Sequence, residues 1–480
     1  MEIQIAALTS PFRALLEAYW PGLAAFFGLL LAIWVTSHIV MTKRDARAAA
    51  AWTGLVWLVP VIGAVFYWIL GVNRIQRRAR MLTEQGVLEH VDQPPAVQPR
   101  PRATHLHTLS ELSGRLTGLP LTTGNSVTPL EAIQAHQSIL AAIREATESV
   151  YLVTYIFGND EAGREVIAAL SDAVERGVRV RVLIDGMGLL YSWPTVFRAM
   201  RRRGIVVDRF LYSLAPWRMP YVNLRNHRKI IVVDRQVGFT GGMNLRGGYI
   251  RQPVEIRDIH ARVEGPVVAH LLRSFAADWY FTTGEALNNT YAGPMAQGSV
   301  LARGISAGPD ADFGKRRLTL LAAVGGAQHE IRIVTPYFVP DQTLLTALEL
   351  ACMRGVRVEL MVPANNNLRI VHWASLHQMA WLVEEGCDLF FSSGPFDHTK
   401  IMTVDGHWSM LGSGNWDARS LRLNFEFDLE CYDEALATEL NGMIDRRRAN
   451  ARRISLADLN GQPYPRRLRN AIACMLEPYL

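Results

Sequence analysis

One pattern of residues occurs twice in this chain of 480 residues, and it constrains the fold more than any other feature. Each copy reads His, any residue, Lys, four residues, Asp, and then a Gly- or Ser-rich turn that ends in Asn. The second copy follows the first at a constant offset of 171 positions. The copies are His227, Lys229, Asp234, Gly241, Gly242 and Asn244, and then His398, Lys400, Asp405, Gly412, Ser413 and Asn415. A doubled pattern in register predicts two similar halves that share one active site.

The repeat extends well beyond these motifs. Each half has an apolar, β-branched run, then a helix-length stretch that closes on Gly177 or Gly355, then a second strand-like run. The paired runs are 150–157 and 331–338, followed by 178–184 and 356–362. Strand, helix and strand in this order predict a βαβ unit. We therefore expect an α/β fold with two duplicated α/β/α domains, each a largely parallel sheet covered by helices. The expected domains span residues 109–300 and 301–480.

The motif can be placed on this framework. Because the residues after each Lys are strand-like, His and Lys should point to the same face, about 7 Å apart along the chain. Asp234 and Asp405 complete the catalytic pattern, but they have the opposite parity and precede an expected hairpin turn. We interpret them as braces of that turn. The return strands should bring Asn244 and Asn415 back beside the His and Lys, where they can bind a phosphate group.

Two His, two Lys and two Asn around one point suit phosphoryl transfer from a diester. Lys229 and Lys400 would neutralise the nonbridging oxygens. One neutral imidazole would attack phosphorus, and the other, protonated, would donate to the leaving alkoxide. A carboxylate behind each His would set its tautomer, and the candidates are Asp258 and Glu426, because each lies about thirty residues past the His of its own half.

The pattern calls for no metal and no other cofactor. Clustered carboxylates are absent from it, and the four cysteines lie far apart in the sequence. Their spacing indicates neither a zinc site nor a disulfide framework.

The N-terminal region differs in composition from the rest. Residues 21–41 and 51–71 are uncharged and apolar, and each run is long enough to cross a bilayer as a helix. We expect a two-helix membrane hairpin within residues 1–80, followed by a Pro-rich linker over residues 81–108. The distribution of Lys and Arg favours a cytoplasmic catalytic region, although both sides of the hairpin are basic. The alternative is a buried helical hairpin in a soluble core.

The paired motifs with their GGxN and GSxN turns resemble the phospholipase D superfamily over roughly residues 130 to 450. The two apolar spans and the segments TGGMN, RDIHARVEGP and SLRLNFE are similar to those of bacterial cardiolipin synthases. This resemblance implies a multi-pass protein of the bacterial inner membrane. It also implies that two phosphatidylglycerol molecules are condensed into cardiolipin, with release of glycerol, through a phosphohistidine intermediate. By carry-over, His227 would be the nucleophile and His398 the acid and base, and the near-symmetry of the two motifs leaves the exchanged assignment open.

Two other activities stay open on the same scaffold. In a phospholipase D, water would replace the lipid alcohol, and no motif reports whether the pocket excludes water. A nuclease is favoured by the net charge of +6 and the pI near 9.2. It is disfavoured by the membrane hairpin and by the lack of an aromatic and basic tract for bases, so we expect lipid and not nucleic acid as the partner. The sequence leaves the oligomeric state open, including a homo-oligomer.

Overall fold

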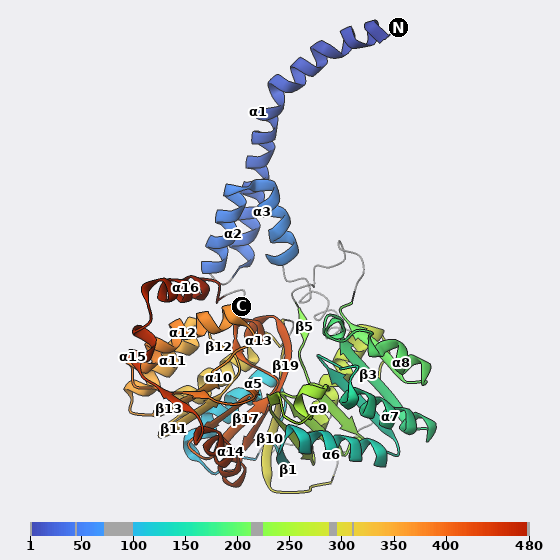
Figure 1. Ribbon diagram of the computed structural model, residues 1–480, viewed down its shortest axis with the longest axis vertical. Coiled ribbons are helices and arrows are strands. Elements are labelled where there is room, and N and C mark those ends of the chain that lie inside the picture. The colour runs from blue at the N-terminus through green and yellow to red at the C-terminus, as the bar shows by residue number, and fades with distance from the viewer. Residues whose placement is uncertain are drawn as a thin grey trace. The chain divides into compact units, whose positions relative to one another are not determined.

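The computed structural model describes residues 2–43, 46–71, 99–212, 224–287, 295–309 and 312–477. The chain forms two compact units, one with the N-terminal helices and the other with an α/β body (Figure 1). Most of the predicted linker, up to residue 98, lies outside the described residues. Its last part already forms the short helix η2 (Thr104–Leu106) and the start of helix α5 (His107–Thr117).

The N-terminal unit begins with the long helix α1 (Glu2–Thr42). Among the described helices, this one is long and apolar enough to cross a membrane, over Tyr19–Thr42 with a mean hydropathy of 2.1. The second predicted span is divided into α2 (Ala46–Leu58), α3 (Pro60–Phe66) and the π turn η1 (Tyr67–Gly71). The break falls at Val59 (φ −141°, ψ 81°), immediately before a proline that cannot donate a backbone hydrogen bond. A hairpin of two spanning helices therefore stays a prediction.

The first half of the α/β body follows the expected repeat. Its elements are β1 (Thr122–Glu131), α6 (Ala132–Glu145), β2 (Ser149–Thr154), α7 (Glu161–Glu175), β3 (Arg179–Asp185), η3 (Gly188–Tyr191), α8 (Val196–Arg202), β4 (Val206–Phe210), β5 (Arg225–Asn226), β6 (Ile230–Val233), β7 (Val237–Gly241), η5 (Gly247–Tyr249), β8 (Ile256–Arg257), β9 (Ile259–Glu264) and α9 (Val268–Thr283).

The second half repeats this order and adds elements at its end. They are β10 (Val300–Ala307), α10 (Lys315–Gly326), β11 (Glu330–Val334), β12 (Phe338–Val339), α11 (Gln342–Met353), β13 (Arg357–Pro363), α12 (Arg369–Glu384), β14 (Asp388–Ser392), β15 (Phe396–Asp397), β16 (Ile401–Val404), β17 (Trp408–Gly412), β18 (Trp416–Asp417), α13 (Ala418–Arg422), β19 (Asn424–Tyr432), α14 (Glu434–Arg448), β20 (Arg452–Ile454), α15 (Leu456–Asn460) and α16 (Tyr464–Met475).

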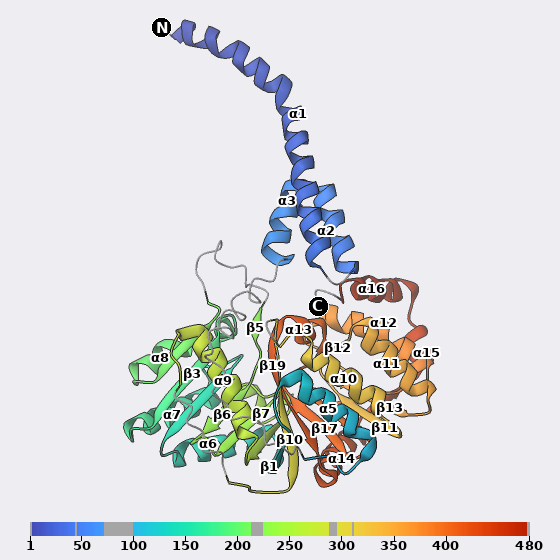
Figure 2. The ribbon, with the colours of Figure 1, turned by 180° about the vertical axis from the view of Figure 1, so that it is seen from behind.

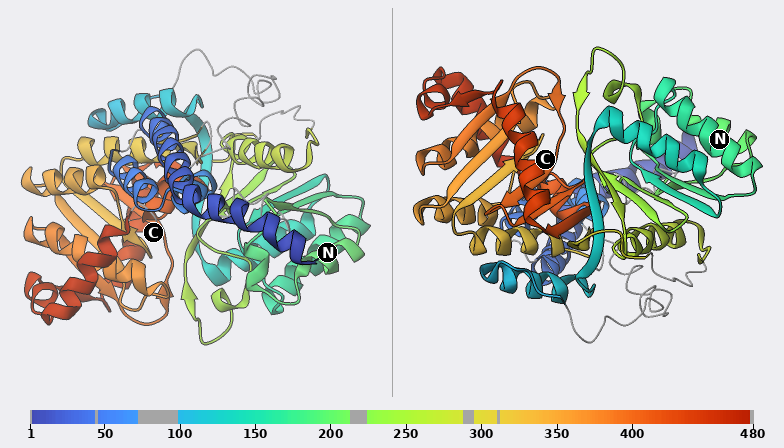
Figure 3. Two further views of the ribbon diagram at one scale, coloured as in Figure 1. Left: turned by 90° about the horizontal axis from the view of Figure 1, so that it is seen from above. Right: turned by 90° about the horizontal axis from the view of Figure 1, so that it is seen from below.

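The two halves form one continuous sheet, joined where β1 pairs antiparallel with β10. From β1 outward the order is β9, β7, β6, β2, β3 and β4, and from β10 outward it is β19, β17, β16, β11, β13 and β14. Equivalent strands thus follow one another outward from the junction in the same order in both halves, which confirms the duplicated α/β domains. Figure 3 shows the two halves side by side, with helices around each part of the sheet.

The expectation of a largely parallel sheet is correct for only part of each half. Strands β2, β3 and β4 are parallel, as are β11, β13 and β14, which confirms the predicted βαβ units. The motif strands β6 and β7 are antiparallel, and so are β16 and β17. The reason is the short connection, since a tight turn can join only antiparallel neighbours. In both turns two consecutive residues have positive φ, Asp234 and Arg235 or Asp405 and Gly406, as a type I′ hairpin requires.

Each half has its own hydrophobic core, formed by alternate residues of its strands. Val150 and Leu152 of β2 pack with α6 and α7, whereas Tyr151 faces Phe275 of α9 on the other side of the sheet. Helix α5, although it precedes β1 in the chain, packs through Leu109 into the core of the second half. Because strand residues are buried on both faces, the motif strands have little freedom to move.

Candidate active site

The strands that lead into the two motifs exchange partners between the halves. Strand β5 pairs with the start of β19, and β15 pairs with β8. The backbone N–H of His227 donates to the carbonyl of Phe425 at 2.8 Å, and that of His398 donates to the carbonyl of Arg257 at 2.7 Å. The backbone of each histidine is therefore fixed by the opposite half, and the two motifs meet at the junction.

The carboxylates behind the histidines are exchanged in the same way. Nδ1 of His227 lies 2.9 and 3.0 Å from the two carboxylate oxygens of Glu426, and Nδ1 of His398 lies 2.8 Å from Oδ2 of Asp258. The sequence correctly predicts both carboxylates as partners of the histidines. It is wrong about the pairing, because it assigns each carboxylate to the histidine of its own half. The crossed pairing follows from the crossed strands, since Glu426 lies on β19 and Asp258 directly follows β8.

Both motif lysines are buried beside the histidines. Nζ of Lys229 donates to the carbonyl of His227 at 2.7 Å. Nζ of Lys400 lies 2.9 Å from Nδ1 of His398 and also donates to the carbonyl of that residue. Burial lowers the pKa of Lys229 to about 7 and that of Lys400 to about 8, and the charge of Lys400 contributes to the shift at Lys229. A bound anion would stabilise the charged forms of both lysines.

The histidines experience the same cluster of charge. Burial lowers the pKa of His227 against the opposing charge of Glu426, and both lysines lower it further. Burial and the charges of Lys400 and Lys229 hold the pKa of His398 well below its usual value. Each lysine thus lowers the pKa of both histidines, as expected for a single site shared by two motifs.

The two carboxylates differ strongly in their surroundings. Besides His227, Glu426 accepts hydrogen bonds from the hydroxyls of Ser413 at 2.6 Å and Ser420 at 2.8 Å, and from the Asn424 amide at 3.2 Å. Burial alone would raise the pKa of Glu426, but His227, Lys229 and Ser413 together lower it to about 2. The carboxylate behind His227 is therefore firmly ionised.

Asp258 has fewer donors. It accepts from the Ile259 N–H at 2.8 Å and from His398, and burial raises its pKa to about 6 against the charge of Lys400. The position equivalent to Ser413 is Gly242, where an added Cβ would lie 2.6 Å from Oδ2 of Asp258. The one-residue difference between the Gly-Gly and Gly-Ser turns thus removes a hydroxyl donor from one carboxylate and supplies it to the other.

The two predicted phosphate-binding asparagines have unlike environments. Oδ1 of Asn244 accepts from the Ile156 N–H at 3.2 Å, and its Nδ2 donates to the Tyr249 hydroxyl at 3.2 Å. Asn415 is held through its backbone carbonyl, which accepts from Arg316 at 2.8 Å, and its Oδ1 has no hydrogen-bond partner among the described residues. A role of either amide in phosphate binding stays a prediction.

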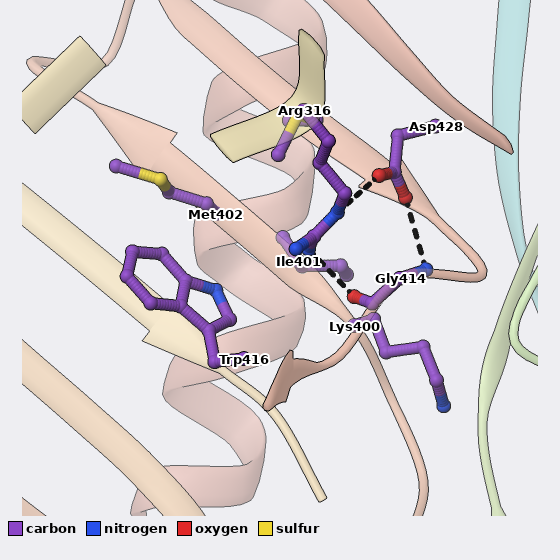
Figure 4. Close-up of a pocket in the computed structure, with 8 residues that line it drawn as sticks. Arg316, Lys400, Ile401, Met402, Gly414, Trp416 and Asp428 are labelled. Carbon is purple, nitrogen blue, oxygen red and sulfur yellow. Dashed lines mark hydrogen bonds and ion pairs between the residues drawn. The ribbon is translucent and has the colours of Figure 1, made fainter. Parts of the chain in front are cut away.

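The turn that carries Asn415 is fixed by a buried ion pair. Arg316 contacts Asp428 at 2.5 Å and donates to the Gly414 carbonyl at 2.7 Å, while Asp428 accepts from the Gly414 N–H at 3.1 Å. Figure 4 shows these contacts around a small cavity that Lys400 also lines. The turn is therefore rigid on the side that faces the motif strand.

Asp234 and Asp405 lie at the opposite end of the motif strands from the histidines. Asp234 accepts from the backbone N–H groups of residues 147, 148 and 149, each at 2.8 Å. Asp405 accepts from those of residues 328, 329 and 330, at 2.9, 2.7 and 2.8 Å, and from His105. These contacts confirm the interpretation of the two aspartates as turn braces. The structure does not bring them to the catalytic cluster that their place in the motif suggests.

Three tyrosines adjoin the histidines, and the sequence interpretation did not include them. The ring of Tyr155 lies 5.2 Å from that of His227, the hydroxyl of Tyr249 lies 3.3 Å from Nδ1 of His398, and the ring of Tyr337 lies 6.2 Å from that of His398. Tyr155 and Tyr337 come just after the first parallel strand of each half. Residues at the carboxyl ends of parallel strands gather at one edge of a sheet, which is the signal that could have found them.

Within the described ranges, no group of three or more His, Cys, Asp and Glu side chains is arranged to hold a metal ion. The four cysteines are present as free thiols. Independence from metals and other cofactors stays a prediction for experiment.

The fold and the crossed His and Lys site define an enzyme of the phospholipase-D-like class. The structure of phosphatidylserine synthase from Haemophilus influenzae superimposes with a TM-score of 0.62, at 15% identity, over 78% of this chain and 100% of that one. A family model described as "Cardiolipin synthase, PLD-like domain" matches residues 139–279 and 320–448, which is more than half of the chain. The chain therefore belongs to the cardiolipin synthase family of phosphatidyltransferases.

Relatives match along nearly the whole chain. A cardiolipin synthase of Geobacillus kaustophilus is 29% identical over 99% of this chain and 98% of its own length. Cardiolipin synthase A of Pseudomonas fluorescens SBW25 is 32% identical, over 97% of this chain and 98% of its own. A model described as "Phospholipase_D-nuclease N-terminal" matches residues 30–71. The similarity thus includes the N-terminal unit as well as the catalytic body.

Proposed function

We propose that this protein joins two phosphatidylglycerol molecules into cardiolipin and releases glycerol. The observation that carries the proposal is the pair of histidines, each backed by a carboxylate from the other half, around two buried lysines. The names of the relatives supply the substrate class. The site itself supplies a nucleophile, an acid and base, and a positive cluster for one phosphodiester.

In the first step, Nε2 of His227 attacks phosphorus of the donor lipid, forming a P–N bond as the bond to the glycerol oxygen breaks. Glu426 accepts the Nδ1–H hydrogen bond and stabilises the positive charge that develops on the imidazole. His398 gives its proton to the departing glycerol oxygen. Lys229 and Lys400 neutralise the nonbridging oxygens, where negative charge increases in the transition state.

In the second step, His398 removes the proton from a glycerol hydroxyl of the second phosphatidylglycerol. That oxygen attacks phosphorus, the P–N bond breaks, and His227 returns to its neutral form. His398 is unprotonated between the two steps, and the proton that it gains in the second step is held by the negative charges of Asp258 and of the bound phosphate for the next turnover. The reaction is balanced, because one phosphodiester is broken and one is formed.

The asymmetry of the two carboxylates supports His227 as the nucleophile. A cationic phosphohistidine is stabilised best by a carboxylate that stays ionised, and the pKa of Glu426 is about 2. His398 must gain and lose a proton within one turnover, which suits a partner such as Asp258 with a pKa of about 6. The near-symmetry of the motifs leaves the exchanged assignment as the alternative outcome of the experiment below.

The decisive experiment is a product assay on the purified full-length protein. With phosphatidylglycerol in liposomes and no added nucleotide or divalent metal, we expect cardiolipin and glycerol in equal amounts. Phosphatidic acid as the sole product would instead establish a hydrolase. His227→Ala and His398→Ala should each abolish turnover. After rapid quenching in alkaline denaturant, in which a P–N bond to histidine survives, lipid-derived phosphate should be attached to residue 227 in the wild type, and attachment to residue 398 would reverse the two roles.

We further propose that the catalytic body lies on the cytoplasmic face of a bacterial inner membrane. A hairpin of two spans, at residues 21–41 and 51–71, would anchor it there. Residues 109–300 and 301–480 would be the two domains of the body. The apolar segment Tyr19–Thr42 and the family match to residues 30–71 support the anchor. Reporter fusions test the topology. If the hairpin forms, a reporter that works only in the cytoplasm should be active when it is fused to either end of the chain. A reporter that works only outside the cytoplasm should be active when it is inserted after Lys43. Activity of the cytoplasmic reporter at all three positions would exclude a topology with two membrane spans.

A further inference from the structure

The C-terminal helix α16 exposes an apolar face to solvent. Five residues form it, with exposed fractions of 74% for Tyr464, 45% for Leu468, 53% for Ile472, 79% for Met475 and 46% for Leu476. Their spacing of three to four residues places them along one side of the helix. A soluble surface helix usually has charged side chains on this side. A continuous apolar stripe there points to a partner that is itself apolar.

The other side of α16 fastens the helix to the catalytic body. Ala473 is buried in a cluster with Val371 and Ala374 of α12, and Asn470 is also buried. The guanidinium of Arg469 lies 4.2 Å above the ring of Trp373. Because Arg469, Asn470 and Ala473 hold one side of the helix against the body, its outward apolar side does not result from loose packing.

The charge on α16 indicates which apolar partner it fits. Arg466 and Arg467 are exposed and Arg469 is half-buried, and the segment from Tyr464 to Leu476 contains no Asp or Glu. Arginines that border an apolar face are typical of helices that lie in the interface of a membrane. The guanidinium groups reach anionic headgroups while the apolar side chains enter the acyl boundary.

The position of α16 agrees with this partner. Figures 1 and 2 show α16 at the same edge of the catalytic body as β5, the strand that leads into His227. The cluster that receives Ala473 also contains Tyr337, whose ring lies 6.2 Å from that of His398. An interface-bound α16 would therefore be connected to the active site through a single layer of packed side chains.

We propose that α16 is a monotopic membrane contact, which lies flat in the headgroup region of an anionic bilayer with Leu468 and Ile472 facing the acyl chains. This contact is separate from the N-terminal apolar helix. It holds the catalytic body against the surface from which its substrate comes, and it does not depend on which product the enzyme forms.

Photo-crosslinking tests the contact directly. The full-length protein, with benzoylphenylalanine at position 468 or 472, is reconstituted in vesicles of phosphatidylglycerol and phosphatidylcholine that contain an alkyne-tagged lipid. We expect tagged lipid on the protein from both positions, and little from the matched exposed position 439 on α14, which Figure 1 draws at the opposite edge of the body. A crosslinked dimer, or peptides of α1 to α3 joined to α16, would overturn the proposal by identifying a protein occupant.

An activity comparison gives an independent readout. The variant Leu468→Ser/Ile472→Ser removes apolar area from the outward side of α16, and neither residue belongs to the buried cluster around Ala473, so its thermal unfolding should stay close to that of the wild type. We expect turnover of phosphatidylglycerol in vesicles to fall by about tenfold, because two apolar anchors are lost. Turnover of a short-chain phosphatidylglycerol dissolved below its micelle concentration should stay within about twofold. An equal loss on both substrates, or on neither, would contradict the membrane contact.

Discussion

Nδ1 of His227 lies 2.9 Å from a carboxylate oxygen of Glu426, a residue 199 positions away in the other half of the chain. The reciprocal contact, 2.8 Å between His398 and Asp258, spans 140 positions. Neither half therefore contains a complete histidine and carboxylate pair. The exchanged strands β5 and β15 fix both pairs at once.

Removal of the carboxylate charge behind His227 should reduce catalysis with little effect on folding. In Glu426→Gln, the side chain still fills its site but no longer stabilises a cationic imidazole. We expect kcat to fall roughly 10²- to 10⁴-fold with a small change in KM. The matched control is Glu434→Gln, which breaks a surface pair with His407 at 3.3 Å. A wild-type kcat in Glu426→Gln would exclude a role for the crossed pair.

Gly242 should tolerate no side chain, because a Cβ there would lie 2.6 Å from Oδ2 and 2.8 Å from Cγ of Asp258. We expect Gly242→Ala to displace Asp258 from His398 and to lower kcat by about 10- to 100-fold. Gly325→Ala is the control, since its Cβ would meet nothing within 4 Å in helix α10. Steady-state kinetics and thermal melts of both variants check the prediction, and equal kinetics would show that Asp258 can move without cost.

The buried lysines predict an alkaline limit to activity. Lysine is charged below its pKa, and the pKa values of Lys229 and Lys400 in the free protein are about 7 and about 8. As pH rises through this range, both charges are lost and phosphate binding weakens. We expect kcat/KM to fall above about pH 7 to 8. The alkaline fall in kcat should occur at higher pH than that in kcat/KM, because the bound anion raises the pKa values of both lysines. A kcat/KM that stays constant to pH 10 would refute the shift.

The pH prediction has a matched variant. Lys400→Arg keeps a positive charge at all accessible pH values, because the guanidinium does not titrate there. Its rate should be lower, since the geometry of the amine is lost, but the part of the alkaline limb that belongs to Lys400 should disappear. An unchanged limb in this variant would assign the titration to another group.

The motif aspartates should affect stability and not chemistry. We expect Asp234→Asn and Asp405→Asn each to lower the free energy of unfolding by about 1 to 3 kcal/mol, because charged acceptors of three backbone N–H groups become neutral. The kcat of the folded protein should change by less than about tenfold. Asp172→Asn, at an exposed position of α7, is the control. A large loss of kcat with an unchanged melting temperature would instead show that these aspartates take part in catalysis.

The same two variants have a defined dependence on pH. Despite burial, hydrogen bonds from the backbone hold the pKa of Asp234 and of Asp405 below 3.8. Their contribution to stability is therefore present above that value and is lost as pH falls through the lowered pKa. Denaturant unfolding at pH 7 and at low pH should show that the difference between wild type and variant shrinks in acid.

Local patterns in the sequence predict much of this protein because they depend on neighbouring residues. The βαβ units, the glycines that end α7 and α11, and the hairpin turns at Asp234 and Asp405 all follow from propensity and spacing over a few residues. The doubled motif likewise predicts a shared site, since two copies with one offset require two similar folds. The continuous second span does not follow in the same way, because α2 ends at Leu58 just before Pro60.

Only the tertiary structure decided which groups meet. The sequence by itself determined that His227, His398, Asp258 and Glu426 belong to one site, but distance along the chain assigns each carboxylate to the wrong histidine. The exchange of β5 and β15 between the halves reverses that assignment, and it depends on strand pairing across the junction. The different hydrogen-bond donors of Glu426 and Asp258, and hence their different pKa values, likewise arise only once the turns with Ser413 and Gly242 are folded against these carboxylates. Contacts between residues far apart in the chain carry no local signal, so they emerge only when the sheet is assembled.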